Sequence, residues 1–137
     1  GVAGLTGLVK EADPGILAEV VGSRLQPHLF PPNYTVITRG NPASSMYFIE
    51  SGCCVATAGG REVERLYPGD FFGEVGVMVA YERTADVRTT GSVEAWELHA
   101  EDLWQLLAAF PSLSAALRSS ASSRLAIADL HRRPPPP

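Results

Sequence analysis

Short β-rich runs separated by turn residues make up the middle of this 137-residue chain. The runs are Tyr34–Thr38, Met46–Glu50, Cys53–Ala58, Glu62–Leu66, Asp70–Phe72, Ala85–Thr89 and Val93–His99. Gly59-Gly60 is a strong signal for a two-residue hairpin turn, because both positions can adopt a positive φ. Many short strands at this spacing predict an antiparallel sandwich or barrel of the jelly-roll kind.

Helical patterns flank the β-rich middle on both sides. Asp13-Pro14 is typical of a helix start, and the apolar spacing that follows predicts a helix from about Pro14 to Leu25, which Pro27 ends. After His99, one predicted helix presents Leu103, Leu106, Leu107 and Phe110 on a single face and ends at Pro111. A last helix has the apolar stripe Leu113, Leu117, Ala121, Leu125 and Ala128.

Composition excludes several classes of protein. The chain is 45% hydrophobic and 19% charged, which is typical of one folded domain. A net charge of −4 argues against a nucleic-acid partner, since the basic surface that such a protein needs is missing. No apolar run is long enough to cross a bilayer and no signal peptide is visible, so we expect no direct membrane insertion of this segment.

Cysteine and histidine usage gives further expectations. Cys53 and Cys54 are adjacent, and neighbours seldom form an unstrained disulfide, so we predict a cytosolic domain. His28, His99 and His131 lack metal-ligand spacing, so we expect neither a metal nor a cofactor. The start at Gly1 without a methionine indicates a domain cut from a longer protein, and we expect residues 134–137, all proline, to be disordered.

The segment Phe71–Val87 carries the candidate site. Gly73 allows a ligand to approach the backbone closely, and amides at the start of a helical turn can bind an anion. Arg83 adds a planar fork of donors that matches phosphate oxygens. Because a carboxylate would repel the phosphate, Glu74 is expected to face another group, such as a sugar hydroxyl. The segment therefore predicts a ligand with a phosphate and a ribose.

The motifs around this segment resemble those of cyclic nucleotide-binding domains. Phe72-Gly73-Glu74 followed by Arg83-Thr84-Ala85 is similar to that family's phosphate-binding cassette. Met46–Gly52 resembles its second strand and glycine turn, and Tyr67–Phe72 resembles the approach to the cassette. The resemblance covers Asp13 to His131 and is closest to the C-terminal regulatory domains of cyclic-nucleotide-gated, hyperpolarisation-activated and plant-type potassium channels.

The resemblance implies an α+β, mainly β fold. We expect an eight-stranded antiparallel β-roll, jelly-roll-like, with an N-terminal helix, a short phosphate-cassette helix and two C-terminal helices. The domain would span residues 1–133. Its N-terminal helical part would cover about 1–30, the β-roll about 33–99, and the C-terminal helices about 100–132.

The resemblance also implies roles for individual residues. The Gly73 amide and the amides of the next turn would contact the cyclic phosphate, Glu74 would accept a hydrogen bond from the ribose 2′-hydroxyl, and Arg83 would pair with the phosphate. Thr84 would add a phosphate or purine contact. The predicted ligand-binding residues are Phe72, Gly73, Glu74, Val75, Gly76, Arg83, Thr84, Ala85, Arg124, Leu125 and Ile127. Which residue of the last helix caps the base stays open.

Two positions depart from the family pattern. Gly76 stands where alanine or cysteine is common, which would cost the short helix about 0.5–1 kcal/mol. Asn33 stands where a glycine is common in a turn, and we expect the turn to survive because asparagine tolerates a positive φ.

The function that the resemblance implies is regulatory and not enzymatic. The domain would bind cAMP or cGMP, and movement of its last helix would transmit binding to a parent protein, an ion channel or another effector, within an oligomer that the parent forms. The parent would be a membrane protein with this domain in the cytoplasm. One alternative is a protein-interaction module of a channel or kinase regulatory subunit that has lost nucleotide binding, and another is a metal-dependent cupin-type enzyme. Nucleotide preference and the direction of regulation stay open.

Overall fold

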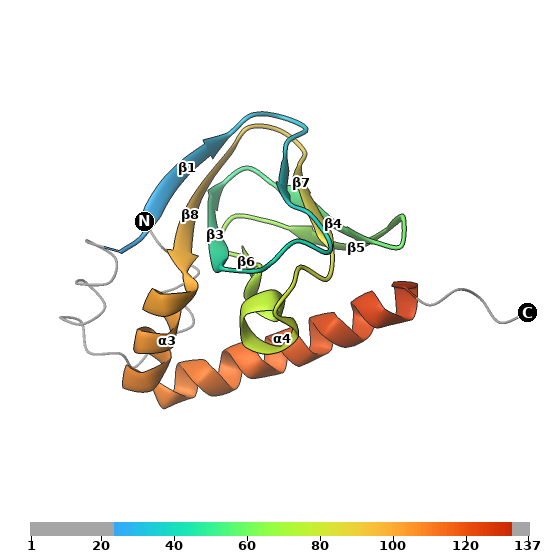
Figure 1. Cartoon of the computed structure of the whole chain (residues 1–137). Helices are drawn as coiled ribbons and strands as arrows, with labels where there is room; N and C mark the ends of the chain where they lie inside the picture. The colour runs from blue at the N-terminus through green and yellow to red at the C-terminus, as the bar shows by residue number, and fades with distance from the viewer. Residues whose placement is uncertain (1–23, 133–137) are drawn as a thin grey trace, which may run out of the picture.

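The computed structural model describes residues 24–132 as a mainly β domain with helices on one side (Figure 1). In chain order the elements are β1 (Gln26–Phe30), β2 (Thr35–Ile37), β3 (Ser45–Ser51), β4 (Cys54–Ala58), β5 (Arg61–Leu66), β6 (Phe71–Phe72), the π-helix η1 (Gly76–Ala80), β7 (Asp86–Thr89), β8 (Val93–His99), α3 (Ala100–Ala109) and α4 (Pro111–Arg132). The predicted mainly β fold, with eight strands and two C-terminal helices, is confirmed. The helix predicted over Pro14–Leu25 and the proline tail fall almost wholly outside the described residues.

The strands form two four-stranded sheets that close around a shared core. One sheet has the order β1-β8-β3-β6 and the other β2-β7-β4-β5, and every pairing is antiparallel. The core between them contains buried side chains from both sheets, including Phe30, Tyr47, Leu66, Phe72 and Val87. Alternating residues of each strand face this core, which is the jelly-roll arrangement that the short strands predicted.

Residues 26–30 correct the predicted boundary of the N-terminal helical part. They form β1, which pairs with β8 from Gln26 opposite Glu97 to Phe30 opposite Val93. Pro27 cannot donate a hydrogen bond to a neighbouring strand, but β1 lies at the edge of its sheet, where proline is tolerated. The proline was interpreted as the end of a helix, whereas it belongs to an edge strand.

Two predicted turns are confirmed. Gly59 and Gly60 have φ values of 59° and 76° and join β4 to β5 in a tight hairpin. Asn33 has a φ of 57°, so asparagine does adopt the left-handed conformation that the turn before β2 requires. Its side-chain oxygen accepts a hydrogen bond from Nη1 of Arg88 at 3.0 Å, which joins this turn to β7.

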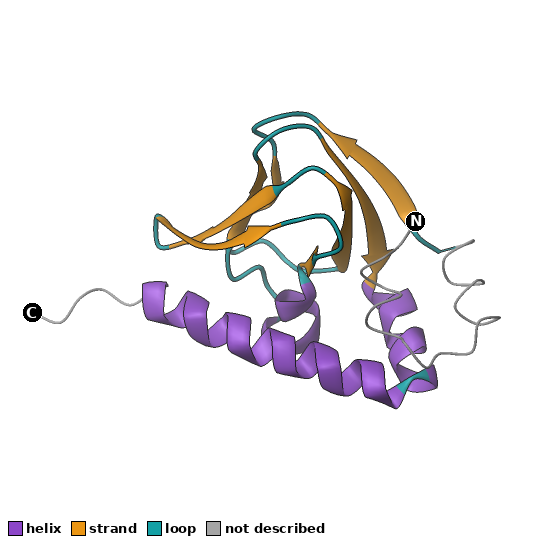
Figure 2. Ribbon diagram, turned by 180° about the vertical axis from the view of Figure 1, so that it is seen from behind, coloured by secondary structure: helices purple, strands orange, loops and turns teal. Residues whose placement is uncertain are grey.

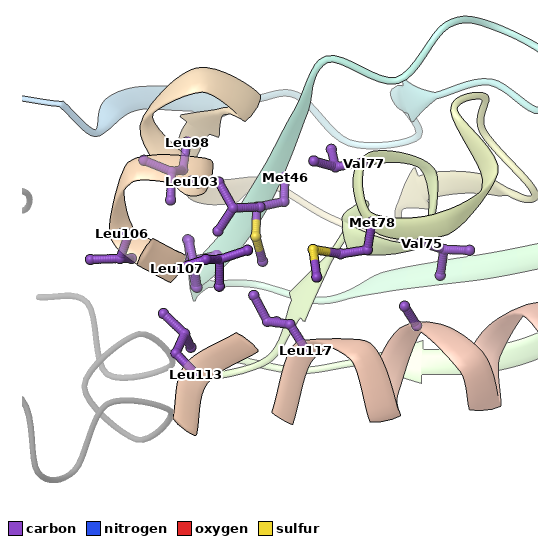
Figure 3. Close-up of a cluster of buried hydrophobic side chains, with 12 residues drawn as sticks. Met46, Val75, Val77, Met78, Leu98, Leu103, Leu106, Leu107, Leu113 and Leu117 are labelled. Atoms are coloured by element: carbon purple, nitrogen blue, oxygen red, sulfur yellow. The ribbon is translucent and has the colours of Figure 1, made fainter. Parts of the chain in front are cut away.

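A second core lies between the β-roll and the helices (Figure 3). It joins the outward-facing Met46, Phe48 and Leu98 to apolar residues of η1, α3 and α4. The predicted helix faces are confirmed, since Leu103, Leu106, Leu107, Leu113 and Leu117 are all buried here. Within residues 24–132 no helix is long and apolar enough to cross a membrane.

Helix α4 runs along the open side of the roll and passes η1 (Figure 2). It contacts η1 and α3 as well as strands β4 and β5 of the second sheet. This course brings the C-terminal half of α4 next to the segment that carries the candidate site.

Candidate functional site

The segment Phe71–Val87, called the cassette below, has at its third position a glycine that the geometry requires. Gly73 has a φ of +92°, a conformation that side chains other than glycine rarely adopt. A Cβ atom built there would lie 2.9 Å from Nη1 of Arg83 and 3.2 Å from the carbonyl oxygen of Ser45. The backbone at Gly73 is therefore packed directly against the arginine that the sequence predicted as its partner.

Arg83 is buried, with 6% of its surface exposed. Its Nη1 donates a hydrogen bond to the Gly73 carbonyl oxygen at 3.0 Å. Burial lowers the pKa of its guanidinium, and the nearby Tyr47, Glu97 and Glu74 oppose that effect. The Gly73 carbonyl therefore holds this buried side chain, and a solvent-exposed ion pair with Glu82 or Glu74 does not. A buried cation fixed by a backbone carbonyl is suited to bind an anion.

The backbone around Arg83 is fixed by the loop that precedes β3. The amide of Gly40 donates to the Arg83 carbonyl at 2.8 Å, and the Arg83 amide donates to the Asn41 carbonyl at 2.8 Å. The amide of Ala43 donates to the carbonyl of Tyr81, which ends η1 with a φ of 63°. Main-chain bonds therefore hold both ends of the turn between η1 and Arg83.

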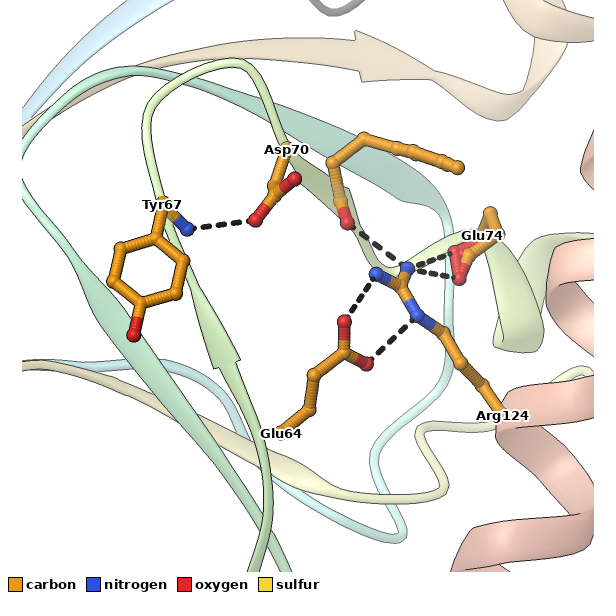
Figure 4. A network of polar contacts seen from close by, with 6 residues as sticks. Glu64, Tyr67, Asp70, Glu74 and Arg124 are labelled. Atoms are coloured by element: carbon orange, nitrogen blue, oxygen red, sulfur yellow. Dashed lines mark hydrogen bonds and ion pairs between the residues drawn. The ribbon is translucent and has the colours of Figure 1, made fainter.

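Glu74 is fully buried and forms an ion pair with Arg124 of α4 (Figure 4). Nη1 of Arg124 lies 2.5 Å and 2.8 Å from the two carboxylate oxygens. Burial raises the pKa of Glu74, and the charge and hydrogen bond of Arg124 partly oppose that rise. A carboxylate has lone pairs beyond those that one nitrogen uses, so Glu74 keeps the capacity to accept another hydrogen bond.

Arg124 has further partners besides Glu74. Its Nε and Nη2 donate to the two oxygens of Glu64 at 3.0 Å and 2.9 Å, and its Nη1 donates to the Phe71 carbonyl at 2.9 Å. Its guanidinium carbon also lies 5.1 Å from the centre of the Phe71 ring. Burial alone would lower the pKa of the Arg124 guanidinium. The nearby Glu74 and Glu64 carboxylates outweigh burial and raise this pKa.

These groups line one cavity of about 60 Å³ between the cassette, the second sheet and α4. All of the sequence-predicted ligand residues except Leu125 line it: Phe72, Gly73, Glu74, Val75, Gly76, Arg83, Thr84, Ala85, Arg124 and Ile127. Leu125 packs instead against the core shared with the other helices. Residues that the sequence did not indicate also line the cavity: Ile37, Ala56, Val63, Glu64, Leu66, Val87 and Ala128.

Glu64 is the charged lining residue that sequence reasoning missed. It lies on β5, where its neighbours Glu62 and Arg65 are exposed, so the strand looks like an ordinary solvated edge. The available signal was weak: an acid two residues before the buried Leu66, on the strand that leads toward the cassette.

Residues 27–110 match the family described as the cyclic nucleotide-binding domain. The chain belongs to this family. Among curated proteins, it is 30% identical over 118 residues to the human potassium/sodium hyperpolarization-activated cyclic nucleotide-gated channel 3. That match covers 86% of this chain and 15% of the channel. The mouse potassium/sodium hyperpolarization-activated cyclic nucleotide-gated channel 2 is 27% identical over 118 residues, and that match covers 14% of the channel. The cyclic nucleotide-binding domain described here thus spans about 15% of the length of such relatives.

Solved structures share the fold of this cyclic nucleotide-binding domain. The PKAR CBD2 domain with bound Sp-2Cl-cAMPS superimposes with a TM-score of 0.81 at 17% identity, covering 98% of this chain and 90% of that one. The catabolite activator protein of Thermus thermophilus gives a TM-score of 0.74 at 26% identity, covering 90% of this chain and 60% of that one. The β-roll predicted from the resemblance is therefore confirmed.

One departure of this cyclic nucleotide-binding domain from its family has a steric reason. Gly76 was interpreted as a weak point in the short helix. A Cβ atom there would overlap the Cβ of Ala43 and lie 2.9 Å from the Glu82 carbonyl oxygen. Gly76 is therefore needed for close packing between η1 and the loop before β3, which is a correction to the propensity argument.

No group of three or more histidine, cysteine, aspartate or glutamate side chains within residues 24–132 is arranged to hold a metal ion.

Proposed function

We propose that this cyclic nucleotide-binding domain binds cAMP or cGMP as a regulatory ligand and performs no chemistry on it. One observation carries the proposal. The positively charged Arg83 and the negatively charged Glu74 are both buried, and both line the same cavity. Arg83 is fixed at the Gly73 carbonyl and is suited to the cyclic phosphate. Glu74 lines the same cavity and can accept a hydrogen bond from the ribose 2′-hydroxyl.

Movement of α4 would transmit the signal. Sites for small molecules typically measure about 300–1,000 Å³, so a nucleotide cannot enter the 60 Å³ cavity while Arg124 lies on Glu74. Admission of the ligand therefore requires α4 to shift. The ligand can shift the equilibrium between the open and closed positions of α4 only by the difference between its binding free energies for these two positions.

We propose further that the parent protein is an ion channel whose opening this domain regulates from the cytoplasm. The similarity to hyperpolarization-activated channels over 86% of the chain supports this proposal. A parent assembled from several such subunits would bring copies of the domain together.

A second candidate is a protein-interaction module that no longer binds nucleotide. Arg124 favours it, because the protein's own guanidinium already satisfies the buried Glu74 carboxylate. In that case α4 would stay closed on the cassette, and a partner protein would recognise the closed form.

Calorimetric titration of the purified chain with cAMP and with cGMP distinguishes these candidates. We expect a binding heat for at least one nucleotide. Arg83→Ala should weaken binding ten- to over a hundredfold, about 1.5–3 kcal/mol, because charged hydrogen bonds to the phosphate are lost. Arg118→Ala is the matched control, since Arg118 lies exposed on α4 and its guanidinium donates a hydrogen bond to the nearby Ser114. Absence of heat for both nucleotides would favour the interaction module.

A further inference from the structure

Glu64 attaches the C-terminal half of α4 to the second sheet. Its two carboxylate oxygens accept hydrogen bonds from Nε and Nη2 of Arg124, so the two planar groups meet edge to edge (Figure 4). Bidentate arginine–carboxylate pairs of this kind are stronger and more directional than single contacts. The pair joins residues 60 positions apart in the chain.

The contacts of Arg124 divide between two parts of the roll. Nη1 bonds to Glu74 and to the Phe71 carbonyl, which belong to the cassette. The other edge of the guanidinium bonds to Glu64 of β5, in the sheet on the opposite side of the core. Glu64 therefore holds α4 through a contact separate from the one that involves the predicted ribose-binding carboxylate.

The exposure of the pair suits a contact that opens and closes. The side chain of Glu64 is 38% exposed and that of Arg124 is 21% exposed, whereas Glu74 is fully buried. Solvent screens a partly exposed pair, so breaking it costs much less than breaking a buried one. Glu64 thus adds a moderate stabilisation to the closed position of α4.

We propose that Glu64 is a positioning residue that sets how fast the ligand enters the site. The proposal rests on the proposed function. The cavity is too small for a nucleotide while α4 is closed, so each entry waits for an opening of α4, and in the bound state α4 is displaced from its closed position. Loss of the Glu64 contact makes opening more frequent and therefore accelerates entry. Exit starts from a state in which this contact is already broken, so the exit rate should stay the same.

The test compares Glu64→Gln with Glu62→Gln. Glu62 lies on the same strand and pairs with Arg65, so its substitution makes the same change in charge but leaves the Glu64–Arg124 pair in place. Association and dissociation of cAMP and cGMP are measured by surface plasmon resonance on the immobilised full chain. We expect Glu64→Gln to raise the association rate constant about three- to tenfold and to lower Kd by the same factor, with an unchanged dissociation rate constant, and Glu62→Gln to change neither rate constant. Glu64→Asp, which keeps the charge, should fall between Glu64→Gln and wild type.

A second measurement separates this proposal from the proposed function. Amide hydrogen exchange is followed in the chain without added nucleotide, and Glu64→Gln should accelerate exchange in the C-terminal half of α4 relative to Glu62→Gln. Equal exchange in the two variants would overturn the proposal, whether or not the wild type binds a nucleotide. A weaker Kd with an unchanged association rate would also overturn it, because that result indicates direct contact with the ligand. Failure of the wild type to bind either nucleotide would instead overturn the proposed function.

Discussion

Nη1 of Arg124 lies within hydrogen-bonding distance of both carboxylate oxygens of Glu74, although 50 positions separate the two residues in the chain. One is a helix residue near the C-terminus, and the other begins the helical turn of the cassette. The charge of the fully buried carboxylate is neutralised by this contact. The position of α4 and the state of the site are therefore physically linked, and the link can be tested by substitution.

Removal of the arginine should destabilise the domain. Arg124→Met leaves the buried Glu74 charge without its partner, so we expect the free energy of unfolding to fall by about 3 kcal/mol. Adding Glu74→Gln should restore part of the loss, since no unpaired buried charge then remains. Urea unfolding of the variants gives both values. A loss equal to that of the exposed control Arg118→Met would contradict this account.

Substitution of Gly73 should affect both the backbone and Arg83. Gly73 and Gly69 have nearly equal φ values, +92° and +93°, but only at Gly73 would a Cβ atom meet neighbours. Alanine at either position should cost about 1–2 kcal/mol from the backbone conformation. Gly73→Ala should cost more and should also weaken nucleotide binding, because the new methyl group displaces Arg83. Unfolding and calorimetric titration of both variants measure the difference.

Gly76→Ala should reduce stability, contrary to helix propensity. Propensity alone predicts a gain of about 0.5–1 kcal/mol. The contact with Ala43 and the Glu82 carbonyl instead predicts a loss of about 1–3 kcal/mol, as in other overpacked sites. Gly91→Ala is the matched control, since within residues 24–132 no atom beyond its two chain neighbours lies within 4 Å of a Cβ there. Thermal unfolding decides between the two signs, and a higher Tm for Gly76→Ala would refute the steric account.

Glu97 should make stability depend on acid pH. Burial alone would raise its pKa, but hydrogen bonds from Ser45, His28 and Tyr47 outweigh burial and lower the pKa below the usual value of 4.5. A carboxyl whose pKa is lower in the folded state stabilises the fold above its unfolded pKa. That stabilisation is lost as the pH falls through the pKa that Glu97 has in the folded state. Urea midpoints between pH 7 and pH 3 should therefore fall more steeply in wild type than in Glu97→Gln.

The matched control for the pH experiment is Glu94→Gln. Glu94 lies exposed on the same strand, and its carboxylate accepts a hydrogen bond from the Ser51 hydroxyl. Its pH profile should follow that of the wild type. Equal slopes for Glu97→Gln and wild type would show that the hydrogen bonds to Glu97 do not favour its ionised form.

Local signals in the sequence predicted most of the fold. Gly59-Gly60 predicted its hairpin because glycine can adopt a positive φ at little cost whatever its surroundings, and the spacing of Leu103, Leu106 and Leu107 predicted a buried helix face. β1 was missed because its pairing with β8 depends on residues about 70 positions away. No local feature of the sequence around Pro27 distinguishes an edge strand from the end of a helix.

Local sequence signals likewise predicted some residues of the candidate site, whereas the position of others depends on packing. Gly73, Glu74 and Arg83 lie in one continuous segment, so their types and spacing were sufficient to predict them. The involvement of Glu64 depends on how α4 crosses β5, which only packing determines. Rotation of α4 about its axis decides that Ile127 lines the cavity whereas Leu125 faces the helical core.

The loop before β3 holds Arg83 through main-chain atoms alone. Such bonds do not depend on side-chain identity, so the exposed positions Asn41 and Ser44 can be changed without moving the arginine. An environment-sensitive fluorophore attached at Asn41→Cys would therefore lie beside the predicted phosphate site while leaving its geometry intact. The same scaffold that fixes the site thus makes the domain a practical starting point for an engineered nucleotide biosensor.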